Sequence, residues 1–134
     1  MAELINIEGI GSHQAGRFAA AGITSQEQLL AAAATPNARA DLAARVEATM
    51  DQILNWANRA DLARVNGIGD QYADLLELAG VDTVPELAQR NPGNLHAKLA
   101  EINDEKIVVD RLPGAAEVAR WVAEAKELPR ALHY

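Results

Sequence analysis

The sequence contains no cysteine, which excludes disulfide bridges and metal sites built on thiolates. Aromatic residues make up only 4% of the chain, although 49% of the residues are hydrophobic. The core must therefore be packed mainly by alanine, leucine, isoleucine and valine, and so much alanine favours closely packed helices. A chain of 134 residues is long enough for one compact domain or for two small domains packed together.

Long apolar runs are also absent, and the start of the chain carries no positive charge. Residues 1–6 lack the basic start and apolar centre of a signal peptide, so we expect a cytoplasmic protein without a membrane partner. Lysine and arginine number 12 against 19 aspartates and glutamates, which gives a formal net charge of −7. Nucleic-acid binders usually present a basic face, so this charge disfavours a nucleic-acid partner without excluding one.

The chain does contain a short motif that occurs twice. Ile7-Glu8-Gly9-Ile10-Gly11 is followed 58 positions later by Val65-Asn66-Gly67-Ile68-Gly69. The same offset relates Ala21-Gly22-Ile23 to Ala79-Gly80-Val81, and Ser25 and Gln28 to Thr83 and Glu86. A fixed offset over this length indicates that one supersecondary unit is used twice.

Each copy of the unit predicts the same local structure. Two closely spaced glycines suit a tight turn, and we name these turns the first glycine turn (Gly9–Gly11) and the second glycine turn (Gly67–Gly69). Apolar residues at helical spacing follow each turn and end at a glycine. A serine or threonine with Gln or Glu three positions later then predicts the capping box of a further helix.

This pattern resembles the helix-hairpin-helix motif, and the chain resembles an uncharacterised bacterial domain-of-unknown-function family (number four-three-three-two) with two such motifs. The resemblance covers nearly all of the 134 residues. It rests on Gly9-Ile10-Gly11, Ala21-Gly22-Ile23, Trp56 to Leu62, Gly67-Ile68-Gly69, Tyr72 to Leu76, Ala79 to Thr83 and Glu127 to Arg130. It implies an all-α fold of tandem helix-hairpin-helix repeats, residues 1–62 and 63–134, packed as one compact helical domain without a flexible linker.

Three further expectations concern individual positions. Thr49 is a candidate cap for a helix break near Glu47 and Ala48, but the family resemblance implies glycine at position 47, so Glu47 predicts that the flanking helices run on with less of a turn. Ile107, Val108 and Val109 are β-branched, but lying between helical signals they favour a short helix. Trp56 and Trp121 fall late in each copy and are expected in the core, because a buried indole supplies a large apolar area.

The first glycine turn is a candidate phosphate-binding site. Unpaired amides and the positive end of the following helix attract anions. Ser12 and His13 can donate hydrogen bonds, and Arg17 lies within about two turns, so that Gly9, Ile10, Gly11, Ser12, His13 and Arg17 form the candidate site. The family resemblance points in the same direction, because the helix-hairpin-helix motif binds DNA backbones in other proteins.

The second glycine turn is interpreted as structural. Gly67, Ile68 and Gly69 are followed by Asp70, and no basic residue comes before Arg90. An aspartate at this place is expected to cap the helix and to repel a phosphate. Arg39 and Arg45 also share a helix with interleaved acidic residues, which is typical of a solvated face of mixed charge.

No catalytic constellation is apparent in the sequence. The three histidines lie far apart, without carboxylates at metal-ligand spacing, so we expect no metal and no cofactor. Leu112-Pro113-Gly114 resembles the hairpin of helix-hairpin-helix base-excision glycosylases, but the second glycine is missing and no catalytic lysine or aspartate can be assigned. Phosphate loops and nucleophile elbows are absent too, so we expect no enzyme activity.

Two functional hypotheses follow. The first is a non-enzymatic adaptor that binds an unknown protein partner or itself, which the acidic charge favours. The alternative is sequence-independent nucleic-acid binding to the phosphate backbone through the first glycine turn, with Arg17 as its only charged anchor.

Overall fold

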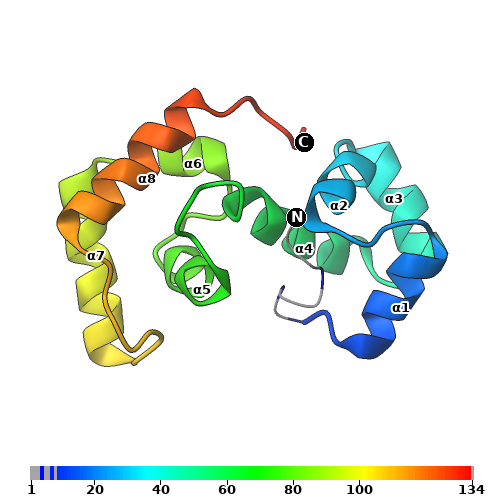
Figure 1. Ribbon diagram of the computed structural model, residues 1–134, viewed down its shortest axis with the longest axis horizontal. Helices are drawn as coiled ribbons and strands as arrows, with labels where there is room; N and C mark the ends of the chain where they lie inside the picture. The colour runs from blue at the N-terminus through cyan, green and yellow to red at the C-terminus, as the bar shows by residue number, and fades with distance from the viewer. Residues whose placement is uncertain (1–3, 5–6, 8, 134) are drawn as a thin grey trace. The chain divides into compact units, whose positions relative to one another are not determined.

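The computed structural model describes residues 4, 7 and 9–133, and that part of the chain forms eight α-helices and no strand (Figure 1). The helices are α1 (Ser12–Ala20), α2 (Gln26–Ala32), α3 (Pro36–Arg45), α4 (Met50–Leu62), α5 (Asp70–Leu78), α6 (Val84–Ala88), α7 (Pro92–Glu105) and α8 (Ala115–Glu127). The predicted all-α class is confirmed. None of the described helices combines the length and apolar character needed to cross a lipid bilayer.

The chain divides into two compact units. Unit 1 comprises the residues up to Asp61 together with those from Arg130 onwards, and unit 2 comprises Leu62–Pro129. The second repeat was predicted to span residues 63–134, whereas the chain returns to unit 1 after Pro129.

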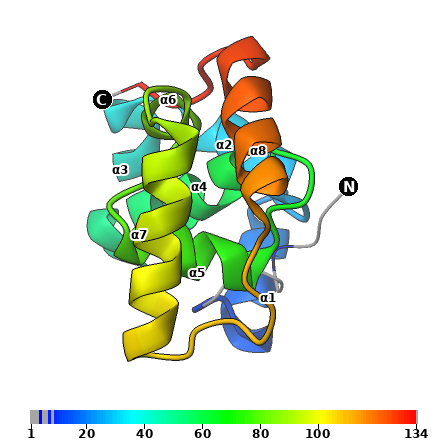
Figure 2. The same cartoon turned by 90° about the vertical axis from the view of Figure 1, so that its left-hand side faces the viewer.

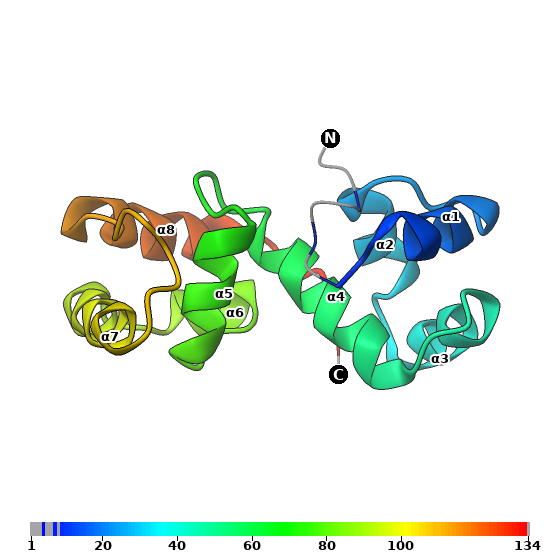
Figure 3. The same ribbon diagram turned by 90° about the horizontal axis from the view of Figure 1, so that it is seen from below.

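Unit 1 contains α1, α2, α3 and all of α4 except its last residue, Leu62 (Figure 3). Its core includes Phe18, Leu29, Leu42, Ile53 and Trp56, which come from all four helices. The Trp56 ring meets Phe18 edge-on, with ring centroids 5.8 Å apart and planes at 72°. This geometry is favourable for an aromatic pair, and the predicted core position of Trp56 is confirmed.

The chain's last residues complete the core of unit 1. Leu132 is buried among the side chains of this core. The His133 N–H donates to the Ala34 carbonyl at 2.8 Å. Arg39 is itself buried and donates to the carbonyls of Ala33 and His133, both at 2.9 Å. The interpretation of Arg39 as part of a solvated face was therefore wrong, because its guanidinium satisfies buried carbonyl groups.

A sharp turn separates α3 from α4, although Glu47 predicted less of a turn here; the predicted cap at Thr49 is confirmed. Glu47 takes up the left-handed conformation with φ of 55°, and it is the only described residue other than glycine with a positive φ. Thr49 then starts α4 with a reciprocal cap. Its Oγ1 accepts from the Gln52 N–H at 3.0 Å, and its own N–H donates to Gln52 Oε1 at 2.9 Å. These two hydrogen bonds stabilise the start of α4, and the turn forms although glutamate, not glycine, occupies the left-handed position.

Unit 2 packs α8 against α6 and α7, and α5 against α7 (Figure 2). Its core contains Leu76, Leu87, Leu95, Leu99 and Trp121, which come from α5 to α8. The predicted core position of Trp121 is also confirmed.

The 58-residue repeat is present in the backbone itself. The first glycine of each turn has nearly the same positive φ, 92° at Gly9 and 93° at Gly67. The glycines that end α1 and α5 agree as well, with φ of 86° at Gly22 and 89° at Gly80. The next helix in each copy is capped by a hydroxyl, from Ser25 and Thr83 respectively. Identical turn chemistry therefore gives identical local structure at both places.

Candidate functional site

The second glycine turn joins α4 to α5 and is closed by two backbone hydrogen bonds. The Val65 N–H donates to the Leu62 carbonyl at 3.1 Å, and the Ile68 N–H donates to the Val65 carbonyl at 3.2 Å. Gly67, with its φ of 93°, lies between them. This conformation costs a residue with a side chain about 1–2 kcal/mol, so glycine is favoured here.

The start of α5 differs from the expected arrangement. Gly69 is the N-cap residue, with φ of −90° and ψ of −173°, and Asp70 is the first residue of the helix. The prediction that Asp70 would cap α5 was wrong, because the helical conformation begins at Asp70 itself. A carboxylate in the first turn is nevertheless favoured by the partial positive charge of the helix N-terminus.

Two residues of α8, Trp121 and Glu124, contact the second glycine turn. The indole of Trp121 is buried, and a methyl group added to Gly67 would lie 3.1 Å from its Nε1. The ring of Tyr72 lies 5.3 Å from the Trp121 ring, at 53°. One helical turn beyond Trp121, both carboxylate oxygens of Glu124 accept from the Asn66 N–H at 3.2 Å. The turn, α5 and α8 thus form one connected structure.

The segment between α7 and α8 forms the opposite side of the site. Ile107, Val108 and Val109 form no helix, so the expected short helix was wrong. The Asn103 side chain replaces the helical bonds: Oδ1 accepts from the N–H groups of Val108 (2.8 Å) and Val109 (3.0 Å), and Nδ2 donates to the Val109 carbonyl (3.2 Å). Val109 is buried, whereas Ile107 is 80% exposed.

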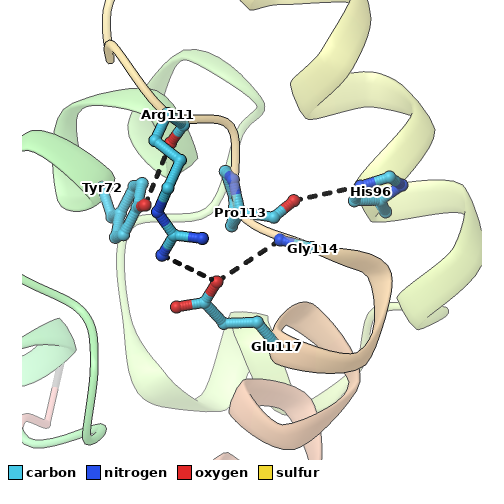
Figure 4. A network of polar contacts seen from close by, with 6 residues as sticks. All are labelled: Tyr72, His96, Arg111, Pro113, Gly114 and Glu117. Carbon is cyan, nitrogen blue, oxygen red and sulfur yellow. Dashed lines mark hydrogen bonds and ion pairs between the residues drawn. The ribbon is translucent and has the colours of Figure 1, made fainter.

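A chain of polar contacts ties this segment to α5 and α8 (Figure 4). The Tyr72 hydroxyl donates to the Arg111 carbonyl at 3.0 Å. The Arg111 guanidinium lies 3.3 Å from Glu117 Oε1, which also accepts from the Gly114 N–H at 3.3 Å. The backbone of Arg111 is thereby fixed beside Tyr72, while its cationic group is directed to Glu117.

The three histidines lie on separate elements of the structure. His96 Nε2 lies 3.1 Å from the Pro113 carbonyl, an acceptor, so Nε2 carries the proton in this contact (Figure 4). His13 lies on α1, and His133 lies in the last segment of unit 1. Among the described residues no group of three or more His, Cys, Asp or Glu could hold a metal ion.

A cavity of about 450 Å³ opens between the second glycine turn and the α7–α8 segment. Its lining residues from the turn and the start of α5 are Gly67, Gly69, Asp70, Gln71 and Tyr72, and those from the segment are Val109, Asp110 and Arg111. The volume lies within the range of small-molecule and side-chain pockets in proteins. We name it the second-turn cavity.

The charged groups of the second-turn cavity have a negative balance. Asp70 and Asp110 both line it, and Arg111 contributes the single positive charge of the lining. Arg111 is paired with Glu117 at 3.3 Å, so its charge is partly compensated from outside the cavity. Asp110 is exposed and makes no ion pair with any residue that the structure describes.

The first glycine turn presents a different set of groups. Gly9 lies against the Trp56 indole, because an added methyl group would be 3.0 Å from Nε1. Gly11, Ser12 and His13 are exposed at the start of α1, and Ile10 is buried. The structure therefore brings most of the predicted residues together on the surface of unit 1.

Arg17, the charged anchor of that predicted site, is not an isolated cation. Its Nε lies 3.4 Å from Glu47 Oε2, and the two side chains are 35% and 74% exposed. The acidic partner, Glu47, comes from the sharp turn between α3 and α4, where the sequence predicted less of a turn. An exposed pair of this kind is weak, but it lowers the local positive potential.

Sequence reasoning missed the residues that complete the second-turn cavity. Arg111 lies 42 positions after Gly69, far beyond Arg90, which is the first basic residue after the second glycine turn in the sequence. Arg90 instead donates to the Ala79 carbonyl at 3.1 Å, next to the glycine that follows α5. The segment has two sequence signals, its β-branched run and Leu112-Pro113-Gly114, and neither indicates that it lies beside the second glycine turn.

Residues 8–128 match the model of a family described as a domain of unknown function (DUF4332). The match covers most of the chain, and the protein belongs to this family. No curated protein and no solved structure matches it. The assignment of the two glycine turns to helix-hairpin-helix motifs stays a prediction.

Proposed function

We propose that this protein is a non-enzymatic interaction module that binds a protein partner, or a second copy of itself, in the cytoplasm. The observation that carries the proposal is the second-turn cavity, which places an aromatic ring, a valine and charged groups beside an exposed turn. Ile107 is 80% exposed two positions before the cavity residue Val109. Apolar groups presented beside a few polar ones are typical of an interaction surface.

The charge distribution supports a protein partner over nucleic acid at this surface. Unit 2 holds seven lysines and arginines against twelve aspartates and glutamates, a formal charge of −5. A phosphate backbone approaching the second glycine turn would meet this field as well as Asp70 and Asp110.

Site-specific photo-crosslinking in the native host tests the proposal. A benzophenone amino acid is placed at Gln71, which is exposed and lines the second-turn cavity. We expect an adduct of defined mass from this position. An adduct of twice the chain mass would identify a second copy, and any other mass would identify a different protein.

The matched control places the same amino acid at Ala119, which is exposed on α8 but does not line the cavity. This position reports encounters that do not depend on the cavity. Equal adduct patterns from the two positions, or none from Gln71, would contradict the proposal.

The second candidate function is nucleic-acid binding through the first glycine turn. The first turn of α1 contains no acidic residue, whereas that of α5 contains Asp70. Exposed Ser12 and His13 lie at this helix N-terminus, where anions are favoured. The Glu47 carboxylate beside Arg17 argues against nucleic-acid binding here, because it lowers the positive potential at this site.

Fluorescence anisotropy with labelled single- and double-stranded DNA tests this alternative. If phosphates are bound, the affinity falls steeply between low and physiological salt, and Arg17→Glu abolishes it. Glu47→Gln, which removes the opposing carboxylate, should raise the affinity. An absence of binding at low salt would refute this second function and leave the first unaffected.

A further inference from the structure

We propose that the second-turn cavity binds a cationic side chain, the guanidinium of an arginine or the ammonium of a lysine, presented by the protein partner. This inference rests on the proposed function and names the chemistry by which the partner is recognised. It is carried by three features of the cavity, namely a fixed aromatic wall, two carboxylates, and an arginine whose charge is directed elsewhere.

The aromatic wall is Tyr72. Its ring is held at 5.3 Å from the Trp121 ring, and its hydroxyl donates to the Arg111 carbonyl at 3.0 Å. These two contacts fix both ends of the side chain before any partner arrives. A preformed aromatic face beside a cavity attracts cations through its quadrupole, and guanidinium groups also stack on such faces.

The carboxylates make the electrostatic potential of the cavity negative. Asp70 and Asp110 line it from the α5 side and from the α7–α8 segment respectively. The opposing charge is that of Arg111, which is 71% exposed and paired with Glu117 at 3.3 Å. The lining therefore carries two negative charges and one positive charge, and the positive charge is paired with Glu117 outside the cavity. A cationic partner group therefore gains favourable interactions that an anion does not.

The glycines of the turn and the volume of the second-turn cavity limit the size of the group that can bind. Gly67 and Gly69 carry no side chain, so the backbone itself forms part of the wall. A volume of about 450 Å³ admits one long side chain with its accompanying water, but not a folded element. The formal charge of −5 on unit 2 adds long-range attraction for a basic segment.

Amide chemical shifts of the full-length, ¹⁵N-labelled protein provide the test. The probe is arginine whose α-amino and α-carboxyl groups are both capped as neutral amides (blocked arginine), so that only its side chain is charged. Blocked citrulline, which has nearly the same shape without the charge, and blocked glutamate are titrated in parallel. We expect the arginine probe to shift the amides of Gly67, Gly69, Gln71, Val109 and Asp110, and the other two probes to leave them unchanged.

Two variants separate the cavity from the general acidity of the unit. Asp110→Asn removes a carboxylate of the lining, and Asp104→Asn removes an exposed carboxylate on α7 outside it. Both raise the net charge by one. We expect Asp110→Asn to weaken binding of the arginine probe at least threefold, and Asp104→Asn to change it by less than a factor of 1.5.

Several results would overturn the inference. They are equal shifts with blocked citrulline, binding of blocked glutamate at the same amides, or equal weakening by the two variants. No shift with any probe would also refute it. The crosslinking at Gln71 keeps the proposed function separate: an adduct there, combined with no binding of the arginine probe, means that a partner docks by other chemistry.

Discussion

At the residue scale, Glu47 is held in a conformation that disfavours its own side chain. Its φ of 55° is accessible to glycine without penalty but costs other residues about 1–2 kcal/mol. Glu47→Gly removes this penalty and also loses the exposed ion pair with Arg17, worth a few tenths of a kcal/mol. We predict that Glu47→Gly raises the free energy of unfolding, measured by urea denaturation, by about 0.5–1 kcal/mol.

Glu47→Ala is the matched control for this prediction. It loses the same ion pair but keeps a β-carbon in the left-handed region, so its stability should be equal to or lower than that of the native protein. The difference between the glycine and alanine variants isolates the backbone contribution. A difference near zero would show that the turn is not strained by its residue.

The four glycines with positive φ allow a second experiment within one molecule. Gly9 and Gly67 lie against indole Nε1 atoms, 3.0 and 3.1 Å from an added methyl group, while Gly22 and Gly80 have no atom within 4 Å of it. Their φ values lie between 86° and 93°, so the left-handed penalty is nearly the same for all four. We predict that alanine at Gly9 or Gly67 destabilises by about 1–3 kcal/mol more than alanine at Gly22 or Gly80.

Tryptophan fluorescence reports the cause of this difference. An alanine beside the indole must displace it, so the emission of the Gly9→Ala and Gly67→Ala variants should change in the folded state. Gly22→Ala and Gly80→Ala should keep the native emission. Equal destabilisation at all four positions would mean that the indoles move aside without loss of stability. The backbone conformation alone would then account for glycine at these positions.

At the scale of elements, Asn103 determines the shape of the segment that forms one side of the second-turn cavity. Its amide makes three hydrogen bonds to the backbone of Val108 and Val109. Asn103→Ala leaves these groups without their partner, which costs about 1–3 kcal/mol. We predict that loss of stability, together with faster hydrogen exchange at the amides of residues 108 and 109.

Asn94→Ala, an exposed change near the start of the same helix, is the control and should alter stability by less than about 0.5 kcal/mol. Asn103→Asp keeps the acceptor for both N–H groups and loses the donor to the Val109 carbonyl. It should therefore fall between the native protein and Asn103→Ala. Native exchange rates in Asn103→Ala would show that the segment keeps its shape without the amide.

Most of the helical elements were predictable because their signals are local. The caps at Ser25, Thr83 and Asn91 act on residues three positions away, and the closing glycines act on the turn just completed. Ile107 to Val109 could not be predicted in this way. Their conformation is set by a side chain on the preceding helix, and the competing helical signals on both sides dominated the interpretation.

At the scale of the whole molecule, the features that sequence reasoning missed are contacts between distant parts of the chain. The Tyr72 hydroxyl donates to the Arg111 carbonyl across 39 positions, and Arg39 donates to His133 across 94. Neither pair leaves a periodic trace in the sequence. The repeat predicted the two glycine turns, but the cavity beside the second one depends on a segment whose own sequence does not indicate where it lies in the fold.

Unit 1 is composed of two stretches that are far apart in the chain, and this has a measurable consequence. Leu132, at 2% exposure, fills a place in its core, although the chain reaches it only after all of unit 2. Leu132→Ala leaves a cavity and should destabilise unit 1 by about 2–5 kcal/mol. We predict that hydrogen exchange accelerates at core amides of unit 1, such as Leu42 and Ile53, while Leu76 and Trp121 in unit 2 keep more of their protection.

Ile107→Ala, which truncates a large apolar side chain at an 80% exposed position, supplies the comparison and should leave both sets of amides unchanged. The distribution of lost hydrogen-exchange protection between the two units shows whether they unfold together. Equal acceleration in both units would mean that they unfold as one cooperative body, because a defect in one core would then lower the global free energy of unfolding. Selective acceleration in unit 1 would mean that each core has its own stability, so that a partner bound to unit 2 could leave unit 1 free to open.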